Sequence, residues 1–207
     1  LWTRPLLDDV VTGAGFGAVD LTTRARPDGA VHVVRAVRER TLADTAAPGM
    51  RLLVCGLNTS VYAADAGVGF ARPGNRFWPA ALAAGLVTRP RDPAHALVAH
   101  GVGMTDLVKR ATPGAAELRP DEYRAGVARV ERLVRWLRPG ALLVVGRAGW
   151  RAAVDRRAVA GPQAGGLGGR PVYVMPNTSG LNARSSLADL TAHIAAASAL
   201  AAEGRVA

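Results

Sequence analysis

Three uninterrupted apolar runs, each followed at once by a glycine or a polar loop, constrain the fold of this chain more than any other feature. Runs of this kind are typical of strands that are buried on both faces of a parallel sheet. Segments with helical character separate them, and the clearest is 121–137, whose apolar residues recur at helical spacing before Pro139-Gly140. The three runs are 51–55, 141–145 and 171–175.

This alternation of strands and helices predicts an α/β fold. Because parallel strands need crossover connections, which are usually helices, we expect a three-layer α/β/α sandwich around a mainly parallel central sheet. The glycine-rich segment 101–106 is interpreted as a strand end or loop, and 161–170 as a flexible loop. Beside 121–137, helices are expected at 75–86, at 93–100, just after 141–145 and at 185–203.

The first 47 residues differ in character from the rest. The turn signal Arg26-Pro-Asp-Gly29 and the apolar run after it suggest a hairpin within 17–37, while the glycines at 13, 15 and 17 suggest a loose start. We therefore divide the chain into an N-terminal extension, 1–47, and a main domain, 48–207. The motif residues described below all lie at Leu57 or beyond, so the extension is expected to be dispensable for chemistry.

Charge and composition limit the function classes. The 26 basic residues exceed the 16 acidic ones, and a net charge of +10 favours a polyanionic partner such as nucleic acid, although an arginine-rich composition alone could produce the same excess. A single cysteine, Cys55, and four scattered histidines exclude a four-cysteine metal site and show no metal-ligand spacing. No apolar run is long enough for a membrane span, and no secretory signal is visible. We expect a soluble, intracellular protein without metal or cofactor.

Two polar segments follow predicted strands: 56–60 (GLNTS) and 176–182 (PNTSGLN). In parallel α/β folds the loops beyond the carboxyl ends of the strands form the reactive site. Neither segment matches a dinucleotide or phosphate-binding glycine motif, and the chain contains no GxSxG serine-nucleophile motif.

Together with a third segment, 70–78 (FARPGNRFW), these motifs resemble the mismatch-specific uracil/thymine DNA glycosylases, the Mug/TDG family, with their GINPG, FAxPxNRFW and NPSGLS motifs. The likeness extends from about residue 48 to 200 and implies a uracil-DNA glycosylase-like fold. The chain departs from the family at Thr59-Ser60, where the family has Pro-Gly, at Thr178, which replaces a proline, and at Asn182, which replaces a serine. These changes leave the base specificity open.

The resemblance implies a role for each motif residue. Asn58 would orient the attacking water; alternatively it only caps the following turn. Asp106 belongs to none of the three motifs; a carboxylate at this position could activate the water or stabilise the cationic sugar, or else it favours a helix N-terminus. Leu57, Phe70 and Asn177 would form the base pocket, with Phe70 stacking on the flipped base unless it is simply a core residue.

A second set of residues would hold the DNA. Leu181, flanked by Gly180 and Asn182, resembles the wedge that fills the gap left by a flipped nucleotide, or else it folds back onto the core. Arg184 and Ser185 would contact phosphates, while Asn75, Arg76 and Trp78 would support the pocket and the start of a helix.

The implied activity is that of a monofunctional DNA repair glycosylase that hydrolyses the N-glycosidic bond of uracil, and of thymine or damaged pyrimidines, opposite guanine. Lys109, the only lysine, lies outside both motifs, which argues against a Schiff-base lyase step. Alternatives are a glycosylase for another base, such as hypoxanthine or an alkylated base, and a lesion-binding relative that does not cleave. The expected partner is double-stranded DNA with a G:U or G:T mismatch, the expected state a monomer, and the expected location the bacterial cytoplasm, in association with the nucleoid.

Overall fold

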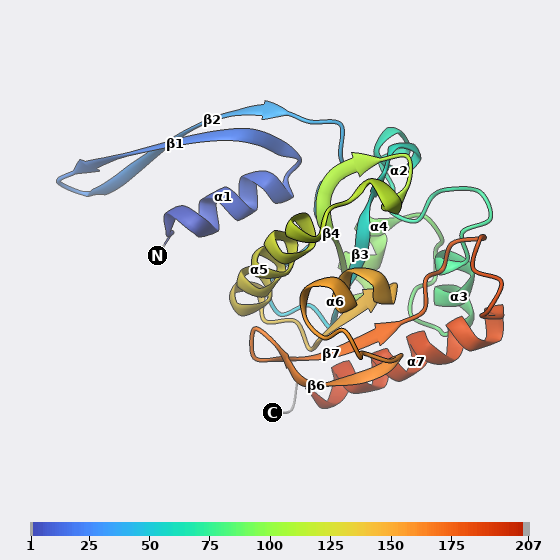
Figure 1. The fold of residues 1–207 in the computed structure, drawn as a ribbon. Helices are drawn as coiled ribbons and strands as arrows, with labels where there is room; N and C mark the ends of the chain where they lie inside the picture. Colours follow the sequence, from blue (N-terminus) through green and yellow to red (C-terminus); the bar gives the residue numbers. More distant parts are fainter. Residues whose placement is uncertain (1, 205–207) are drawn as a thin grey trace.

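The computed structural model describes residues 2–204 and has a five-stranded central sheet as its core (Figure 1). Four strands are parallel, and β6 pairs antiparallel with β7 at one edge. The order across the sheet is β4 (Val102–Thr112), β3 (Leu52–Ser60), β5 (Ala141–Val145), β7 (Arg170–Met175) and β6 (Gly161–Leu167).

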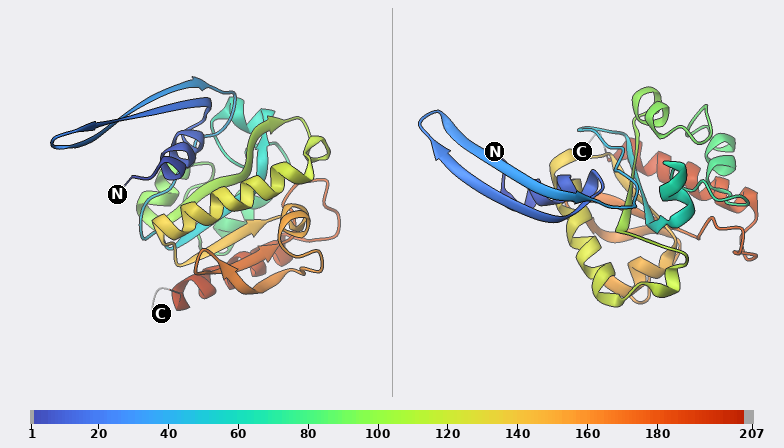
Figure 2. Two further views of the ribbon diagram at one scale, coloured as in Figure 1. Left: turned by 60° about the vertical axis from the view of Figure 1, so that its left-hand side comes forward. Right: turned by 90° about the horizontal axis from the view of Figure 1, so that it is seen from above.

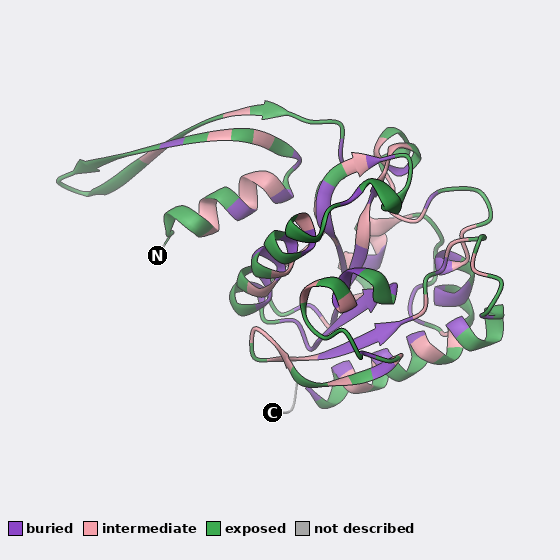
Figure 3. Ribbon diagram, viewed as in Figure 1, coloured by how far each residue is buried: buried purple, intermediate pink, exposed green. Residues whose placement is uncertain are grey.

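Helices cover both faces of this sheet, so the expected three-layer α/β/α architecture is confirmed. On one face, strand residues such as Leu52 and Val54 pack with α3 (Phe77–Ala83), α4 (Pro93–His100) and α7 (Leu187–Glu203). On the other face, Leu53 and Leu142 pack with α5 (Pro120–Leu137) and α6 (Arg147–Ala153). Figure 3 shows the strands buried between the two helical layers. Successive strand residues alternate between the two cores, which explains why the strands read as continuous apolar runs.

Two glycine-rich segments differ from their interpretation: 101–106, interpreted as a strand end or loop, leads into the start of a strand, and 161–170, interpreted as a flexible loop, contains an edge strand. Residues 102–106 belong to β4, and 161–167 form the edge strand β6. Gly103 serves packing, because a Cβ there would lie 2.4 Å from Met50 Sδ and 2.9 Å from the Thr45 carbonyl oxygen. Along β6 most residues are partly or fully exposed, and an edge strand of this kind needs no apolar run that a sequence reading could detect.

The N-terminal residues form a helix and a hairpin. The expected hairpin is present as β1 (Phe16–Arg26) and β2 (Gly29–Arg38), and it projects away from the body of the molecule in all three views (Figures 1 and 2). Before it, α1 (Arg4–Gly13) replaces the loose start that the glycines suggested. Arg132 of α5 donates to Asp9 at 2.6 and 2.8 Å and fixes α1 on the body.

The segment between the hairpin and β3 packs directly against β4. Thr45 and Met104 exchange two backbone hydrogen bonds, of 2.9 and 2.7 Å. Residues 41–45, which we assigned to the extension, therefore contact the central sheet, and Thr41 lies beside Thr59 near the carboxyl end of β3. Within residues 2–204 no helix is long and apolar enough to cross a membrane.

Candidate active site

A pocket of about 470 Å³ opens at the carboxyl ends of β3, β4 and β5. The parallel topology brings together the two polar segments expected there, because both follow strands of the same sheet. The pocket wall includes eight of the residues predicted from the sequence: Leu57, Asn58, Phe70, Asn75, Asp106, Asn177, Leu181 and Asn182.

Asn58 lies near the end of β3 with its carboxamide held in one orientation. Its Nδ2 donates to the Thr59 carbonyl oxygen at 2.9 Å and to Thr112 Oγ1 at 2.8 Å. Thr112 Oγ1 donates in turn to the Gly114 carbonyl oxygen, so it accepts from Asn58. This leaves Asn58 Oδ1 to accept a hydrogen bond from a water in the pocket. The side chain that caps α2 (Val61–Ala66) is Ser60, so the alternative of Asn58 as a turn cap is wrong.

Asp106 lies in the interior of β4, directly opposite Gly56 in the ladder between β3 and β4. It does not begin a helix, so that alternative reading of the residue is wrong. The carboxylate is half-buried on the pocket wall and accepts a hydrogen bond from Thr59 Oγ1 at 2.9 Å. Burial raises the pKa of Asp106, while the Lys109 charge and the Thr59 hydrogen bond act in the opposite direction.

Gly56 makes room for this carboxylate. A Cβ at position 56 would lie 2.3 Å from Asp106 Oδ1 and 3.5 Å from Phe70 Cζ. Because real Cβ atoms do not approach an oxygen so closely, any other residue here would displace Asp106 from its position. The glycine that follows the apolar run is thus required by the site, in addition to marking the strand in the sequence.

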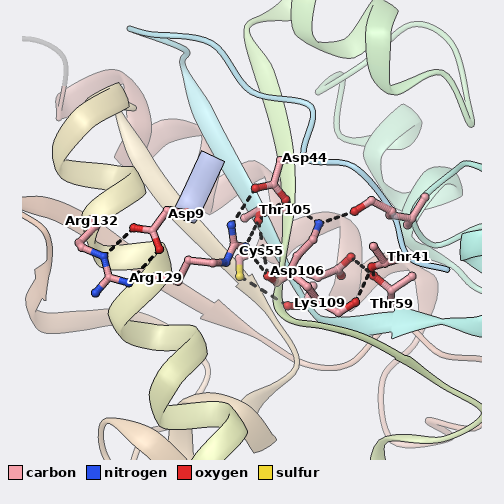
Figure 4. Close-up of polar contacts among 12 residues, drawn as sticks. Asp9, Thr41, Asp44, Cys55, Thr59, Thr105, Asp106, Lys109, Arg129 and Arg132 are labelled. Atoms are coloured by element: carbon pink, nitrogen blue, oxygen red, sulfur yellow. Dashed lines mark hydrogen bonds and ion pairs between the residues drawn. The ribbon is translucent and has the colours of Figure 1, made fainter. Parts of the chain in front are cut away.

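Behind Asp106 lies a buried group of charges (Figure 4). It includes Asp44, which belongs to the part of the extension that packs on β4, residues 41–45, called the N-terminal segment from here on. Asp44 Oδ1 is 2.8 Å from Lys109 Nζ, and Asp44 Oδ2 is 2.9 Å from Arg129 Nη1. Burial alone would raise the pKa of Asp44, but the charges of Arg129 and Lys109 and their hydrogen bonds hold it below its usual range. Two carboxylates and two cations therefore balance here when Asp106 is ionised.

Phe70 lies against the pocket in an unusual backbone conformation. Its φ of +58° falls in the left-handed region, which is strained for a large side chain. The ring stacks on Phe77 with centroids 4.2 Å apart, and the buried Trp78 donates from Nε1 to the Gly69 carbonyl oxygen at 2.9 Å. Phe70 thus both lines the pocket and packs on the core. Asn75 Oδ1 accepts from the Phe77 N–H at 2.9 Å at the start of α3.

The opposite rim of the pocket is the loop between β7 and α7. Leu181 at its tip is 89% exposed, which excludes the alternative in which it folds onto the core. Arg76 holds the loop: its guanidinium donates to the carbonyl oxygens of Ser179, Asn182 and Ser185, and its backbone N–H donates to that of Thr178. Gly180 contacts Gly74 so closely that a Cβ at position 180 would lie 2.9 Å from the Gly74 carbonyl oxygen.

Asn182 and Ser185 take part in the internal structure of this loop. Asn182 Nδ2 donates to the Asn177 carbonyl oxygen at 2.7 Å and to Ser185 Oγ at 3.2 Å. Next to the loop is a shallow groove of about 300 Å³ whose lining includes Arg184 together with Arg147 and Arg151 of α6. The two arginines of α6 were not among the predicted residues, although Arg147 directly follows Gly146, at the carboxyl end of a predicted strand.

Part of the pocket wall comes from residues that no motif indicates. Leu42 reaches the pocket from the N-terminal segment, and residues 112–115 close the side next to Asn58. Thr59 was noted only as a departure from a motif, and nothing in the sequence shows that its hydroxyl reaches Asp106. Leu42 carries no motif, and only the long-range packing of residues 41–45 on β4 brings it there.

Cys55 and Lys109, two other reactive side chains near the site, are buried and lie outside the pocket wall. Within 2–204 no group of three or more His, Cys, Asp or Glu side chains could hold a metal ion. Burial raises the pKa of the Cys55 thiol far above its usual range, so it stays protonated. Lys109 Nζ is bound to Asp44 and to the Leu42 carbonyl oxygen and is not part of the pocket wall.

Residues 43–200, about three quarters of the chain, match the family model described as the uracil DNA glycosylase superfamily.

Proposed function

The chain belongs to the uracil DNA glycosylase superfamily, whose members are DNA glycosylases acting on uracil-like lesions, and from this we propose that it is a monofunctional glycosylase of the Mug/TDG type that removes uracil opposite guanine in duplex DNA. The observation that carries the proposal is that Asn58 on β3 and Asp106 on the adjacent strand β4 both line one pocket. The pocket also contains an aromatic ring, Phe70, on which a flipped base can stack.

The proposed reaction uses a water held between two side chains. Asn58 Oδ1 accepts one hydrogen of this water and Asp106 the other. As the bond from the water oxygen to C1′ of the sugar forms, the N-glycosidic bond breaks and its electron pair leaves with the base. The proton of the water passes to Asp106, and the carboxylate stabilises the oxocarbenium-like sugar before that transfer.

The position of Lys109 supports a monofunctional enzyme. A lyase step needs a free amine that can attack C1′ in the pocket. The only lysine of the chain instead makes a buried ion pair with Asp44 and is 9% exposed. Hydrolysis by water therefore fits the site better than Schiff-base chemistry.

The rim of the pocket supports action on duplex DNA. Exposure of a leucine at a loop tip is costly in water, whereas insertion into the base stack would bury it and fill the gap left by the flipped nucleotide. Arg147 and Arg184 beside the loop would bind the phosphates on either side of the lesion. We propose that the main chain around Leu181 contacts the guanine left unpaired, and that one copy of the chain suffices for this reaction.

Single-turnover cleavage of labelled duplexes with G:U, G:T, A:U or G:hypoxanthine pairs, and of single-stranded uracil DNA, tests the proposal. The wild type should act fastest on G:U. Asn58→Ala should nearly abolish cleavage, and Asp106→Asn should reduce it by about 10²- to 10⁴-fold, the usual contribution of a positioned acid or base. Both variants should still bind the duplex.

The same assay separates the alternatives. If the protein cleaves the G:hypoxanthine duplex fastest, the proposed substrate, uracil, is wrong, whereas the proposed mechanism still applies. Tight binding without formation of abasic sites would show a lesion-binding protein and refute the proposed reaction.

A further inference from the structure

Thr59 connects the candidate catalytic carboxylate to the N-terminal segment. Its side chain is buried, with 1% exposure, and Thr59 Oγ1 lies 2.9 Å from Asp106 Oδ2 and 3.3 Å from Thr41 Oγ1. Thr41, also buried, donates in turn to the Lys109 carbonyl oxygen. Figure 4 shows Thr59 and Thr41 on the side of Asp106 that faces away from Asp44 and Arg129.

The row of hydroxyls suits both protonation states of Asp106. When the carboxylate is ionised, Thr59 donates its hydrogen to Asp106. When the carboxyl is protonated, it can donate to Thr59, whose hydrogen then turns to Thr41, while Thr41 keeps its bond to the Lys109 carbonyl oxygen. The hydroxyls only reorient and the proton stays on Asp106, so no buried oxygen loses a partner in either state.

We propose that Thr59 is a positioning residue that holds the Asp106 carboxylate toward the pocket, and that Thr41 completes a hydroxyl relay which accommodates the proton that Asp106 receives from the attacking water. This inference rests on the proposed function, because it assigns the relay to the same reaction. It also makes the N-terminal segment part of the site, since Thr41 comes from residues outside the matched family region, 43–200.

Other charged and titratable groups also face Asp106, and the test must keep them constant. They are Lys109 on its own strand, Cys55 on β3, Arg129 on α5 and Asp44 from the N-terminal segment. None of them contacts Thr59 or Thr41 through its side chain in the hydrogen bonds of the described residues. Replacement of a threonine hydroxyl therefore changes the relay and leaves these charges in place.

The chain provides a matched control in Thr178. Like Thr59, it is 1% exposed and stands where the resembling family has a proline. Its Oγ1, however, is buried without a hydrogen-bond partner among the described residues. Thr178→Val and Thr59→Val thus each remove one hydroxyl from an equally buried side chain. Only Thr59→Val also removes a hydrogen bond to Asp106.

The experiment combines single-turnover cleavage of G:U with titration of the Asp106 carboxyl by ¹³C NMR in the full chain. Thr59→Val should slow cleavage roughly 10- to 100-fold, the effect of losing one hydrogen bond to a charged group. It should also raise the pKa of Asp106 and move the acidic limb of the rate profile to higher pH, because that bond favours the ionised form. Thr59→Ser keeps the hydroxyl, so its cleavage rate and its Asp106 pKa should both match those of the wild type. Thr178→Val should change neither the cleavage rate nor the Asp106 pKa.

Thr41→Val tests the outer part of the relay. Loss of the acceptor for Thr59 removes support for the protonated form, so the pKa of Asp106 should fall, by less than Thr59→Val raises it. An unchanged Asp106 titration in Thr59→Val, or shifts of the same sign in both variants, would overturn the relay. If the wild type does not cleave any duplex, the proposed function fails, whereas the NMR titration still decides whether the relay exists.

Discussion

The replacement of Asp44 by asparagine should destabilise the protein strongly, although Asp44 lies outside every motif. The side chains of Asp44, Lys109 and Arg129 are only 10%, 8% and 7% exposed. Asp44→Asn keeps the shape of the side chain but removes the negative charge between two buried cations. Because water cannot reach Lys109 and Arg129 in this buried position, hydration does not replace the attraction that they lose when the Asp44 charge is removed.

The size of the effect follows from this burial. Breaking a buried ion pair by removing one partner costs about 3–5 kcal/mol. Arg129 keeps its bonds to Thr105 Oγ1 and the Asp106 carbonyl oxygen, both 2.8 Å, so we expect the lower end, about 3 kcal/mol. For a chain of 207 residues, this lowers Tm by about 6–12 °C.

Thermal unfolding followed by circular dichroism measures the Tm difference between wild type and Asp44→Asn, and Asp65→Asn serves as the control. Asp65 also pairs with an arginine, Arg40, but both side chains are more than half exposed, so Tm should hardly change. Because the folded pKa of Asp44 is lowered, its contribution is present above the unfolded value of about 3.9 and is lost as the pH falls through the folded pKa. The Tm difference between wild type and Asp44→Asn should therefore narrow at acid pH. Equal Tm values at pH 7 would refute the reasoning.

Further predictions concern the site and the extension. Gly56→Ala should reduce G:U cleavage by about 10²-fold at unchanged duplex affinity, because displacing the Asp106 carboxylate by about 1 Å misaligns the water; near wild-type cleavage would contradict this. Leu181→Ala should slow cleavage of paired uracil more than of single-stranded uracil, and equal losses would exclude a wedge. Duplex affinity should fall steeply with salt, as expected for a net charge of +10, and a flat response would show that the charge does not contact DNA. Replacing hairpin residues 22–33 by a short turn should leave cleavage intact, whereas a chain that begins at Pro48 should lose it. The contacts of Leu42 and Asp44 thus reverse the expectation that all of 1–47 is dispensable, and cleavage by the Pro48 chain would restore it.

Much of the candidate site could be predicted because it depends on order along the chain. The runs 51–55, 141–145 and 171–175 correspond to β3, β5 and β7. Once the strands are parallel, their carboxyl ends must share one edge, so the segments after them must meet. The proximity of Asn58 to Asn177 around one pocket follows from that rule without any knowledge of side chains.

The sequence could not tell a glycine that permits a turn from one that permits close packing. At Gly103 and Gly56 the absent Cβ makes space for Met50 and for Asp106, and both glycines lie inside strands. The sequence pattern at 101–106 is the same for either cause. Which cause applies depends on atoms that come from distant segments.

The layered fold follows from the sequence alone, because apolar periodicity and strand order are local properties whose consequences are general. The surroundings of Asp106 depend instead on contacts between distant segments. Asp44 and Lys109 are 65 residues apart, and Asp44 and Arg129 are 85 apart, so no local pattern relates them. The charge of Asp44 becomes useful only where folding removes water from around Lys109 and Arg129, and the Thr59 hydroxyl acquires its role only where β3 and β4 bring it to the carboxylate.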